Sequence, residues 1–213
     1  MGMATTLALF DVDGTMLLTH DDLYVRLMIK TLSEVSGTTL PLNAMSKVEH
    51  KARPVIATAA DILEAHGAGP INMGAWCRLL GTRYRAAFPS AGTSHWEGAP
   101  GAAHGLGRLR DAGIRLALLT GTPESVARLR MERLGLAEFF AGERGGYGCD
   151  STSRVDLIRT ACERAGVETS DAVEIGDTAA DASSALEAGA RSIRFRSMSQ
   201  VCDELLGPDV QPA

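Results

Sequence analysis

Short apolar runs alternate with segments of helical periodicity along most of the chain. Four of these runs have the length and composition of β-strands, namely Leu7–Phe10, Ile114–Thr120, Ala172–Asp177 and Arg191–Phe195. Between them, apolar residues recur every three or four positions, and a glycine follows each segment, as is typical of a helix C-terminus. The predicted helices are Ala102–Ala112, Glu124–Leu134, Val155–Ala165 and Ala180–Ala188. This alternation predicts an α/β fold, with a Rossmann-like parallel sheet and helices on both of its faces.

One long segment interrupts the alternation. Residues 18–94 show only helical periods, and Asn72 is a suitable N-cap for the last of them. The apolar positions of the three expected helices are Leu23, Leu27, Leu32 and Val35, then Val55, Ile56, Ala59, Ile62 and Leu63, then Met73, Trp76, Leu80, Tyr84 and Phe88. A run rich in Pro, Gly and Ser follows. We therefore expect an all-helical cap domain, residues 18–94, inserted after the first strand into a core domain formed by residues 1–17 and 95–213.

Composition excludes several classes of protein. The chain has 213 residues, 45% of them hydrophobic, and a net charge of -5 with no basic block, so a nucleic-acid-binding surface is not expected. No apolar run approaches the roughly 18 residues that span a bilayer. The first apolar run also lacks the basic region that precedes a signal peptide. We expect a cytoplasmic protein with no membrane partner, and the sequence leaves its oligomeric state open.

The four cysteines, Cys77, Cys149, Cys162 and Cys202, show neither a C-x-x-C pair nor the spacing of a zinc site. Scattered cysteines of this kind are typical of free thiols in a reducing compartment.

Acidic residues follow two of the predicted strands. Asp11 and Asp13 end the first strand, and Asp177 and Asp181 follow the third. Ligands of open parallel sheets bind at the carboxyl ends of the strands, so we expect these side chains to meet there. Carboxylates suit Mg²⁺, and Asp11 and Asp177 could hold the ion between them. A free oxygen of Asp11 could then act as a nucleophile, with Asp13 as general acid and base.

The segment LLTGTPES lies between these acidic strand ends in the predicted sheet. Thr120 offers a hydroxyl group and Gly121 lets the backbone approach a ligand closely. Thr122 followed by Pro123 is typical of an N-cap and a first helical residue, and helix N-termini favour anions. Taken alone, the segment is more typical of an ordinary helix start than of a phosphate site. Its position between the acids favours a phosphate-binding role for Thr120 and Gly121.

The motifs FDVDGT, LLTGTPE and EIGDTAAD, in this order and with a helical insert after the first, resemble those of the haloacid dehalogenase-like (HAD) hydrolase superfamily, in its phosphoglycolate phosphatase-like branch. The resemblance covers nearly the whole chain. It implies that Asp11 is the nucleophile, Asp13 the general acid and base, and Thr120 a phosphate ligand. It also implies that Mg²⁺ is bound by Asp177, supported by Asp181, and by the main-chain carbonyl group of Asp13.

The resemblance further implies a lysine that holds the nucleophile and the phosphate. The only lysines, Lys30, Lys47 and Lys51, all lie in the expected cap. Arg154, which opens a predicted helix after a glycine-rich loop, is the best substitute, although an arginine is not equivalent to an ammonium group. The alternative is that Arg154 is a solvated arginine and that Arg144 or the cap supplies the cation.

The segment HKARP in the expected cap carries two further basic residues. Lys51 and Arg53 lie beside a proline that breaks the helical pattern. Related phosphatases contact the substrate from about this position, so both residues are candidates for binding the non-reacting end of the substrate. A solvated basic turn is the alternative.

These observations predict a Mg²⁺-dependent phosphatase that hydrolyses a small phosphomonoester through an aspartyl-phosphate intermediate. Asp13 favours phosphate over halide chemistry, because a dehalogenase needs no acid two residues after its nucleophile. A phosphomutase or a phosphonate hydrolase of the same fold is one alternative, and the second would need a cap lysine such as Lys51 to form a Schiff base. A non-catalytic phosphate-binding or interaction module is the other.

Overall fold

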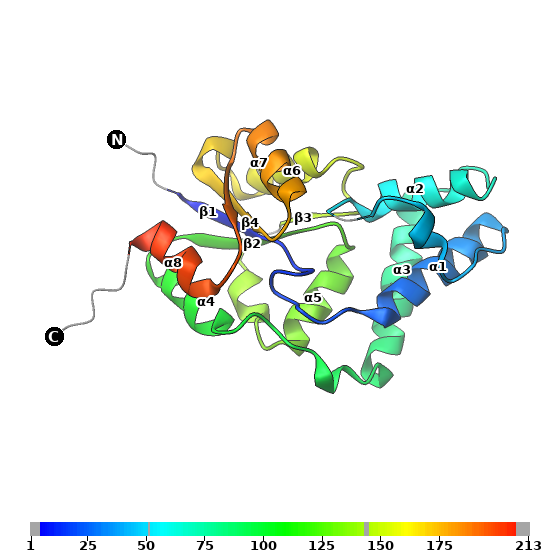
Figure 1. Ribbon diagram of the computed structural model, residues 1–213, viewed down its shortest axis with the longest axis horizontal. Coiled ribbons are helices and arrows are strands. Elements are labelled where there is room, and N and C mark those ends of the chain that lie inside the picture. Colours follow the sequence, from blue (N-terminus) through cyan, green and yellow to red (C-terminus); the bar gives the residue numbers. More distant parts are fainter. Residues whose placement is uncertain (1–4, 51, 143–144, 208–213) are drawn as a thin grey trace.

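A five-stranded parallel sheet forms the centre of the molecule (Figure 1). The computed structural model describes residues 5–50, 52–142 and 145–207. The strands are β1 (Leu7–Phe10), β2 (Arg115–Thr120), β3 (Gly146–Tyr147), β4 (Ala172–Gly176) and β5 (Arg191–Arg194), in the order β3-β2-β1-β4-β5. The predicted α/β class and parallel sheet are confirmed, and the four expected strands lie where the apolar runs placed them. The strand β3 was not expected.

Helices cover both faces of this sheet, and alternate residues of its strands are buried on each side. The helices α6 and α7 lie on one face, and α4, α5 and α8 on the other (Figure 1). Their bounds are α4 (Ala102–Asp111), α5 (Glu124–Arg133), α6 (Arg154–Ala165), α7 (Ala179–Ala188) and α8 (Met198–Leu206). In β1, Leu7 and Leu9 pack under α6 and α7, whereas Ala8 and Phe10 face the opposite layer. The sheet is therefore buried on both faces, as its continuous apolar runs predict.

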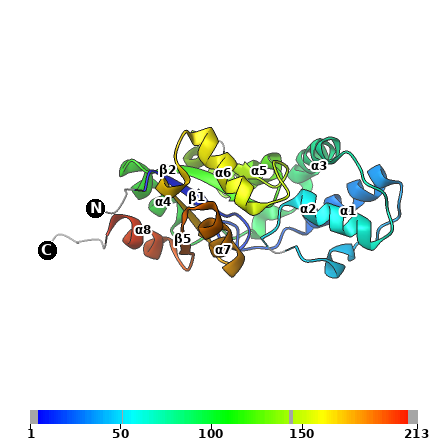
Figure 2. The ribbon, with the colours of Figure 1, turned by 90° about the horizontal axis from the view of Figure 1, so that it is seen from above.

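A helical insert separates β1 from β2. It contains α1 (Asp22–Ser36), α2 (Val55–Ala65) and α3 (Met73–Ala87), and it lies at the end of the molecule opposite the described ends of the chain (Figures 1 and 2). A hydrophobic cluster centred on Trp76, Leu80 and Tyr84 packs the helices of the insert together and extends to Val126 and Leu129 of α5. Trp76 also donates a hydrogen bond from its indole nitrogen to Thr31, at 3.0 Å, which satisfies the buried polar group of each residue.

The expected apolar face of α1 is partly wrong. Its buried residues include Tyr24, Met28 and Ile29, whereas Leu23 and Leu27 are only partly buried and Val35 is 39% exposed. Of the four expected positions, Leu32 is buried. The helix buries a different face from the one expected, and on that face the ring of Tyr24 packs edge-on against the ring of Tyr84 of α3, with 6.3 Å between the ring centroids. Leu23 and Leu27 instead line an open groove on the outer side of the insert.

Backbone hydrogen bonds join the two segments that connect the insert to the rest of the chain, and they join α2 to the edge of the sheet. Where the chain enters and leaves the insert, Leu18 donates its backbone N–H group to Glu97 at 2.9 Å, so the two connecting segments lie side by side. At the start of α2, Val55 donates its N–H group to the carbonyl oxygen of Gly121 at 2.8 Å. A Cβ atom at Gly121 would overlap the carbonyl oxygen of Arg53, so this contact requires glycine.

A disulfide bond makes a third connection. Cys77 of α3 is bonded to Cys149, which follows β3, and 72 positions separate the two cysteines. The prediction of four free thiols is wrong for this pair, because the fold brings α3 beside a loop that the spacing gives no reason to pair with it. Cys162 and Cys202 are free and buried. No helix in the described part of the chain combines the length and apolar character that a bilayer crossing needs.

Candidate active site

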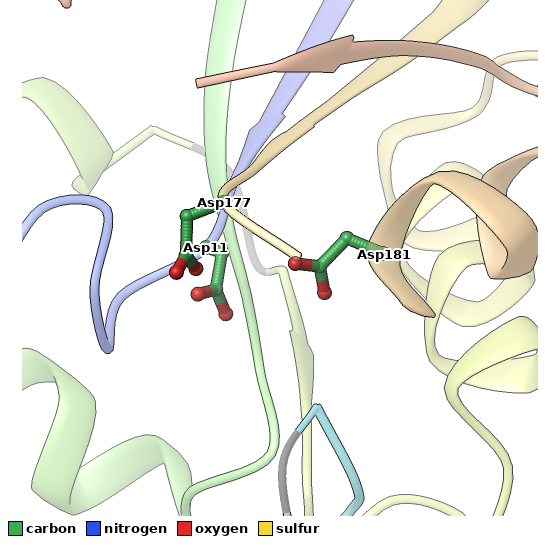
Figure 3. Close-up of side chains that lie close together, drawn as sticks. All are labelled: Asp11, Asp177 and Asp181. Atoms are coloured by element: carbon green, nitrogen blue, oxygen red, sulfur yellow. The ribbon is translucent and has the colours of Figure 1, made fainter. Parts of the chain in front are cut away.

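Three carboxylate groups meet at the carboxyl edge of the sheet. Asp11 follows β1, Asp177 follows β4, and Asp181 lies in the first turn of α7. One oxygen from each lies within 4.8 Å of the others, and Figure 3 shows the three side chains converging. They meet because β1 and β4 are adjacent parallel strands whose carboxyl ends share one edge. The sequence predicted this cluster.

The chain around the cluster leaves room for these acids. Gly14 has a φ of +87°, and a Cβ atom there would lie 2.8 Å from Oδ2 of Asp177. Glycine is therefore required both by the backbone conformation and by the neighbouring carboxylate. Because of this turn, Asp13 and Asp11 lie on the wall of the same cavity.

The donor set fits a divalent cation. Oδ1 of Asp177 is buried and has no hydrogen-bond partner among the described residues. Burial raises the pKa of Asp177, and it raises the pKa of Asp11 well above its usual range, even though Arg154 opposes the shift. A cation among these oxygens would satisfy the unpaired atom and restore the ionised carboxylates.

Arg154 lies beside the expected nucleophile, as the sequence predicted. Its side chain opens α6 and is only 4% exposed, so the alternative of a solvated arginine is wrong. Nη2 of Arg154 lies 3.3 Å from Oδ1 of Asp11 and 2.8 Å from Oδ1 of Asp181. Burial alone would lower the pKa of Arg154, but the surrounding carboxylates raise it, so the guanidinium group is charged. The alternative cation Arg144 lies outside the described residues.

Glu174 was missed by the sequence reasoning. It lies in the middle of β4 with a fully buried side chain, and its Oε1 accepts hydrogen bonds from Nε and Nη2 of Arg154, at 2.9 and 2.8 Å. Burial raises the pKa of Glu174 to about 7, although Arg154 lowers it. The signal was present in the sequence, because a carboxylate inside the apolar run AVEIGD needs a buried partner.

Asp181 has two structural contacts besides its place in the cluster. Its Oδ2 accepts hydrogen bonds from the backbone N–H group and the hydroxyl group of Thr178, at 2.9 and 2.6 Å, and forms a capping box at the start of α7. Its Oδ1 faces Arg154. These contacts orient the carboxylate, and its role as a metal ligand stays a prediction.

Thr120 ends β2 and Gly121 follows it, beside the acids. Oγ1 of Thr120 is buried and accepts a hydrogen bond from the backbone N–H group of Thr122 at 3.2 Å. The predicted N-cap role of Thr122 is wrong, because α5 begins at Glu124 and Pro123 precedes it as N-cap. The carbonyl group of Thr122 instead accepts a hydrogen bond from the backbone N–H group of Gly148, which follows β3.

Asp13 is held by an arginine that the sequence reasoning did not identify. Nη1 of Arg130, in α5, donates hydrogen bonds to both carboxylate oxygens of Asp13, at 3.0 and 2.9 Å. Nε of Arg130 donates to Oδ2 of Asp21 at 3.0 Å, and the hydroxyl group of Tyr84 donates to the same oxygen at 2.6 Å. The side chain of Arg130 is 1% exposed, whereas that of Asp13 is half exposed.

A cavity of about 370 Å³ lies between the sheet edge and the insert. The four acids of the sequence motifs, Thr120, Gly121 and Arg154 line it from the sheet, and Tyr24, Val25, Met28, Met45, Val55 and Thr58 line it from the insert. Arg53 also lines the cavity, but its guanidinium group is paired with Asp61. Lys51, the other candidate for substrate binding, lies outside the described residues.

An α/β sheet with an acidic cluster at its carboxyl edge and a helical insert after its first strand defines a class of hydrolases, and comparison with known proteins identifies the family. The sequence profile of the haloacid dehalogenase-like hydrolases matches residues 5–189. The chain therefore belongs to the haloacid dehalogenase-like hydrolase family, as the motifs indicated.

Individual relatives agree with this assignment. The chain is 31% identical over 189 residues to a phosphoglycolate phosphatase of Rhodospirillum rubrum, covering 85% of this chain and 75% of the relative. It is 26% identical to a phosphoglycolate phosphatase of Agrobacterium fabrum, covering 88% and 78% of the two chains. Among solved structures, CbbY from Rhodobacter sphaeroides in complex with phosphate is similar, with a TM-score of 0.65 and 22% identity over 89% of this chain and 85% of that one.

Proposed function

We propose that the protein is a Mg²⁺-dependent phosphatase that hydrolyses a small phosphomonoester through an aspartyl-phosphate. The observation that carries the proposal is the cluster of Asp11, Asp177 and Asp181 within 4.8 Å, beside a buried arginine and inside one cavity. The names of the relatives point to the same class of reaction. The volume of about 370 Å³ suits a small substrate.

The chemistry follows from the side chains. Oδ of Asp11 attacks phosphorus, the bond from phosphorus to the leaving oxygen breaks, and Asp13 gives that oxygen a proton. Water then attacks the phosphorus of the aspartyl-phosphate and gives a proton to Asp13. The bond between phosphorus and Asp11 breaks, so phosphate leaves and Asp11 is regenerated. Arg154 and Thr120 contact the oxygens of the phosphoryl group. Asp11, Asp177 and the main-chain carbonyl group of Asp13, with Asp181 in support, would hold Mg²⁺, which when bound offsets the negative charge of the site and of the phosphate.

We further propose that residues 18–94 form a cap domain, with residues 1–17 and 95–213 as the core domain. The supporting observations are the purely helical segment between β1 and β2 in the described residues and the paired segments at Leu18 and Glu97. The insert supplies one wall of the cavity, so its position over the sheet edge excludes bulk water from the reacting groups. We propose that Arg53, which lines the cavity, and Lys51 contact the non-reacting end of the substrate.

The test is a phosphatase assay with Mg²⁺ on 4-nitrophenyl phosphate and on a panel of small phosphomonoesters that includes 2-phosphoglycolate. We expect turnover that is lost with EDTA, restored by Mg²⁺, and at least about 10³-fold lower in the Asp11→Asn variant. Undiminished turnover by this variant would refute the mechanism. A sugar phosphate assayed with and without its bisphosphate distinguishes a mutase, which requires the bisphosphate for turnover.

We also propose that the protein is cytoplasmic. The observation that opposes it is the disulfide Cys77–Cys149, because thiols in the cytosol are kept reduced. Fractionation of the native cells, followed by mass spectrometry of the alkylated protein, reports both the compartment and the state of this cysteine pair. A fully oxidised pair in a periplasmic or extracellular fraction would overturn the expected location.

A further inference from the structure

Arg130 is a charged residue at a core position of α5. Its neighbours in the same helix, Val126, Ala127, Leu129 and Met131, are buried apolar residues, and Arg130 itself is 1% exposed. A buried guanidinium group with its ion pairs contributes little net stability compared with an apolar side chain of similar volume, because desolvation offsets the attraction. Packing alone therefore does not explain an arginine at this position.

The contacts of Arg130 connect two parts of the molecule. On one side, Nη1 donates to both carboxylate oxygens of Asp13. On the other side, Nε and Nη2 each lie 3.0 Å from Oδ2 of Asp21, the N-cap residue of α1. Tyr84 of α3 donates to that same oxygen, and the ring of Tyr24 lies against the guanidinium group at 4.9 Å. The arginine thus links Asp13 to two helices of the insert.

This arrangement fixes the direction of the Asp13 carboxylate. The guanidinium group is a planar fork with donors at fixed angles, so it orients its acceptors more strictly than an ammonium group does. In the described part of the chain, Arg130 supplies the hydrogen bonds that the structure shows for the Asp13 side chain. Both residues line the cavity that also contains Asp11 and Thr120. The carboxylate is therefore held at the cavity wall, near the expected position of the leaving group.

We propose that Arg130 is the positioning residue for proton transfer by Asp13, and that Asp21 and Tyr84 hold Arg130 in place from the insert. The proposal rests on the proposed phosphatase function. Asp13 gives its proton to the leaving oxygen as the bond from phosphorus to that oxygen breaks, and it later takes a proton from the attacking water. Arg130 neither gives nor takes a proton in either step.

The test compares two substrates that differ in their need for an acid. An alkyl phosphate has a poor leaving group that must be protonated, whereas 4-nitrophenyl phosphate releases a stable anion. Hydrolysis of the aspartyl-phosphate is the same step for both substrates, so the quantity to compare is kcat/KM, which reports the steps up to departure of the leaving group. In Arg130→Met, we expect kcat/KM for the alkyl phosphate to fall about 100-fold, as a misplacement of about 1 Å does, and kcat/KM for the aryl phosphate to fall less than about threefold. Arg130→Lys should recover part of the loss, since it keeps a charge near Asp13 without the fork.

The control is Arg133→Met on the same helix, because Arg133 is exposed and donates to the hydroxyl group of Thr93. We expect it to leave kcat/KM for both substrates unchanged. If Arg130→Met lowers kcat/KM for both substrates by the same factor, or for neither, the positioning role is wrong. An active wild type with this result refutes only the positioning role, whereas a wild type that hydrolyses no phosphomonoester refutes the proposed function itself.

Should Arg130→Met fail to fold, Tyr84→Phe provides the second variant. It removes the 2.6 Å hydrogen bond to Asp21 and keeps the buried ring. We expect the same preferential loss of kcat/KM for the alkyl phosphate, about threefold to tenfold. An alkyl-to-aryl ratio of kcat/KM that is the same for Tyr84→Phe and wild type would overturn the proposal that the insert holds Arg130 in place.

Discussion

The disulfide bond between Cys77 and Cys149 should contribute a large part of the stability of the protein. It joins α3 of the helical insert to the loop after β3, and it closes a loop across 72 positions of sequence. Reduction removes this cross-link without changing the sequence. The other two cysteines are buried and already free, so a reductant has no second disulfide to break among the described residues.

The loop length sets the expected magnitude. In the chain-entropy description, a cross-link that closes a loop of this length stabilises the folded state by about 4.4 kcal/mol at 25 °C, because it restricts the unfolded chain. A typical domain is stable by roughly 5–15 kcal/mol, so the loss would be a large fraction of the whole. For a urea dependence of about 2–3 kcal/mol per molar, the unfolding midpoint would fall by roughly 2 M.

Urea unfolding of the oxidised and reduced protein, followed by circular dichroism, measures this difference. The matched control is the double variant Cys77→Ser with Cys149→Ser, which cannot form the bond. We expect the variant to unfold at the midpoint of the reduced wild type and to be insensitive to reductant. Free energies of unfolding that agree within about 1 kcal/mol for oxidised and reduced wild type would refute the reasoning, because the cross-link would then not raise the free energy of the unfolded chain relative to the folded one.

Three further predictions concern the site. Burial raises the pKa of Glu174 from its ordinary value of 4.5 to about 7, so the folded protein binds this proton more tightly than the unfolded chain does. The resulting stabilisation is complete below pH 4.5 and is lost as the pH rises through 7. In urea unfolding, the free energy of unfolding of Glu174→Gln should therefore rise relative to that of wild type between pH 5 and pH 8, by up to about 3 kcal/mol. A difference between the two proteins that does not change with pH would contradict this. In steady-state kinetics, Arg154→Ala should lower kcat by about 100-fold or more, and Arg154→Lys by less, because the lysine keeps a charge near Asp11. An Arg154→Ala variant with the wild-type kcat would exclude a role of Arg154 in catalysis. Gly14→Ala should weaken Mg²⁺ binding in a calorimetric titration, because its Cβ would displace Asp177. The control is Gly37→Ala, where φ is a similar +68° but no atom lies within 4 Å of the new Cβ. This control should lose only about 1–2 kcal/mol of stability. Equal Mg²⁺ affinities of the two glycine variants would show that displacement of Asp177 does not matter.

Most of the sheet and its covering helices could be predicted because their signals are local. The apolar run of β1 and the glycine that ends α6 are each a signal from a single element. The sequence pattern therefore predicts the bounds of these elements to within a residue or two. The strand β3 could not be found, since its two residues are extended only because Gly146 pairs with Leu119 of β2. The buried face of α1 also depends on a neighbour, the ring of Tyr84.

The site divides in the same way. Asp11 and Asp177 could be predicted to meet because a general rule places the carboxyl ends of adjacent parallel strands at one edge. Arg130 could not be predicted, because its bonds to Asp13 cross 117 positions of sequence and no pattern in α5 distinguishes it from a solvated arginine. Long-range pairs of this kind depend on how the insert packs against the sheet, and a single sequence contains no direct record of that packing.

Two buried arginines divide the acids of the site into separate groups. Arg154 lies against Asp11, Glu174 and Asp181, whereas Arg130 lies against Asp13 and Asp21. The first group has more negative charge than one guanidinium offsets, so a divalent cation is most favoured there. The side chain of Asp13 belongs to the second group, where its half-exposed carboxylate stays open to the cavity. Different surroundings can give two neighbouring carboxylates different tasks, and the two arginines supply such a difference to acids only two positions apart.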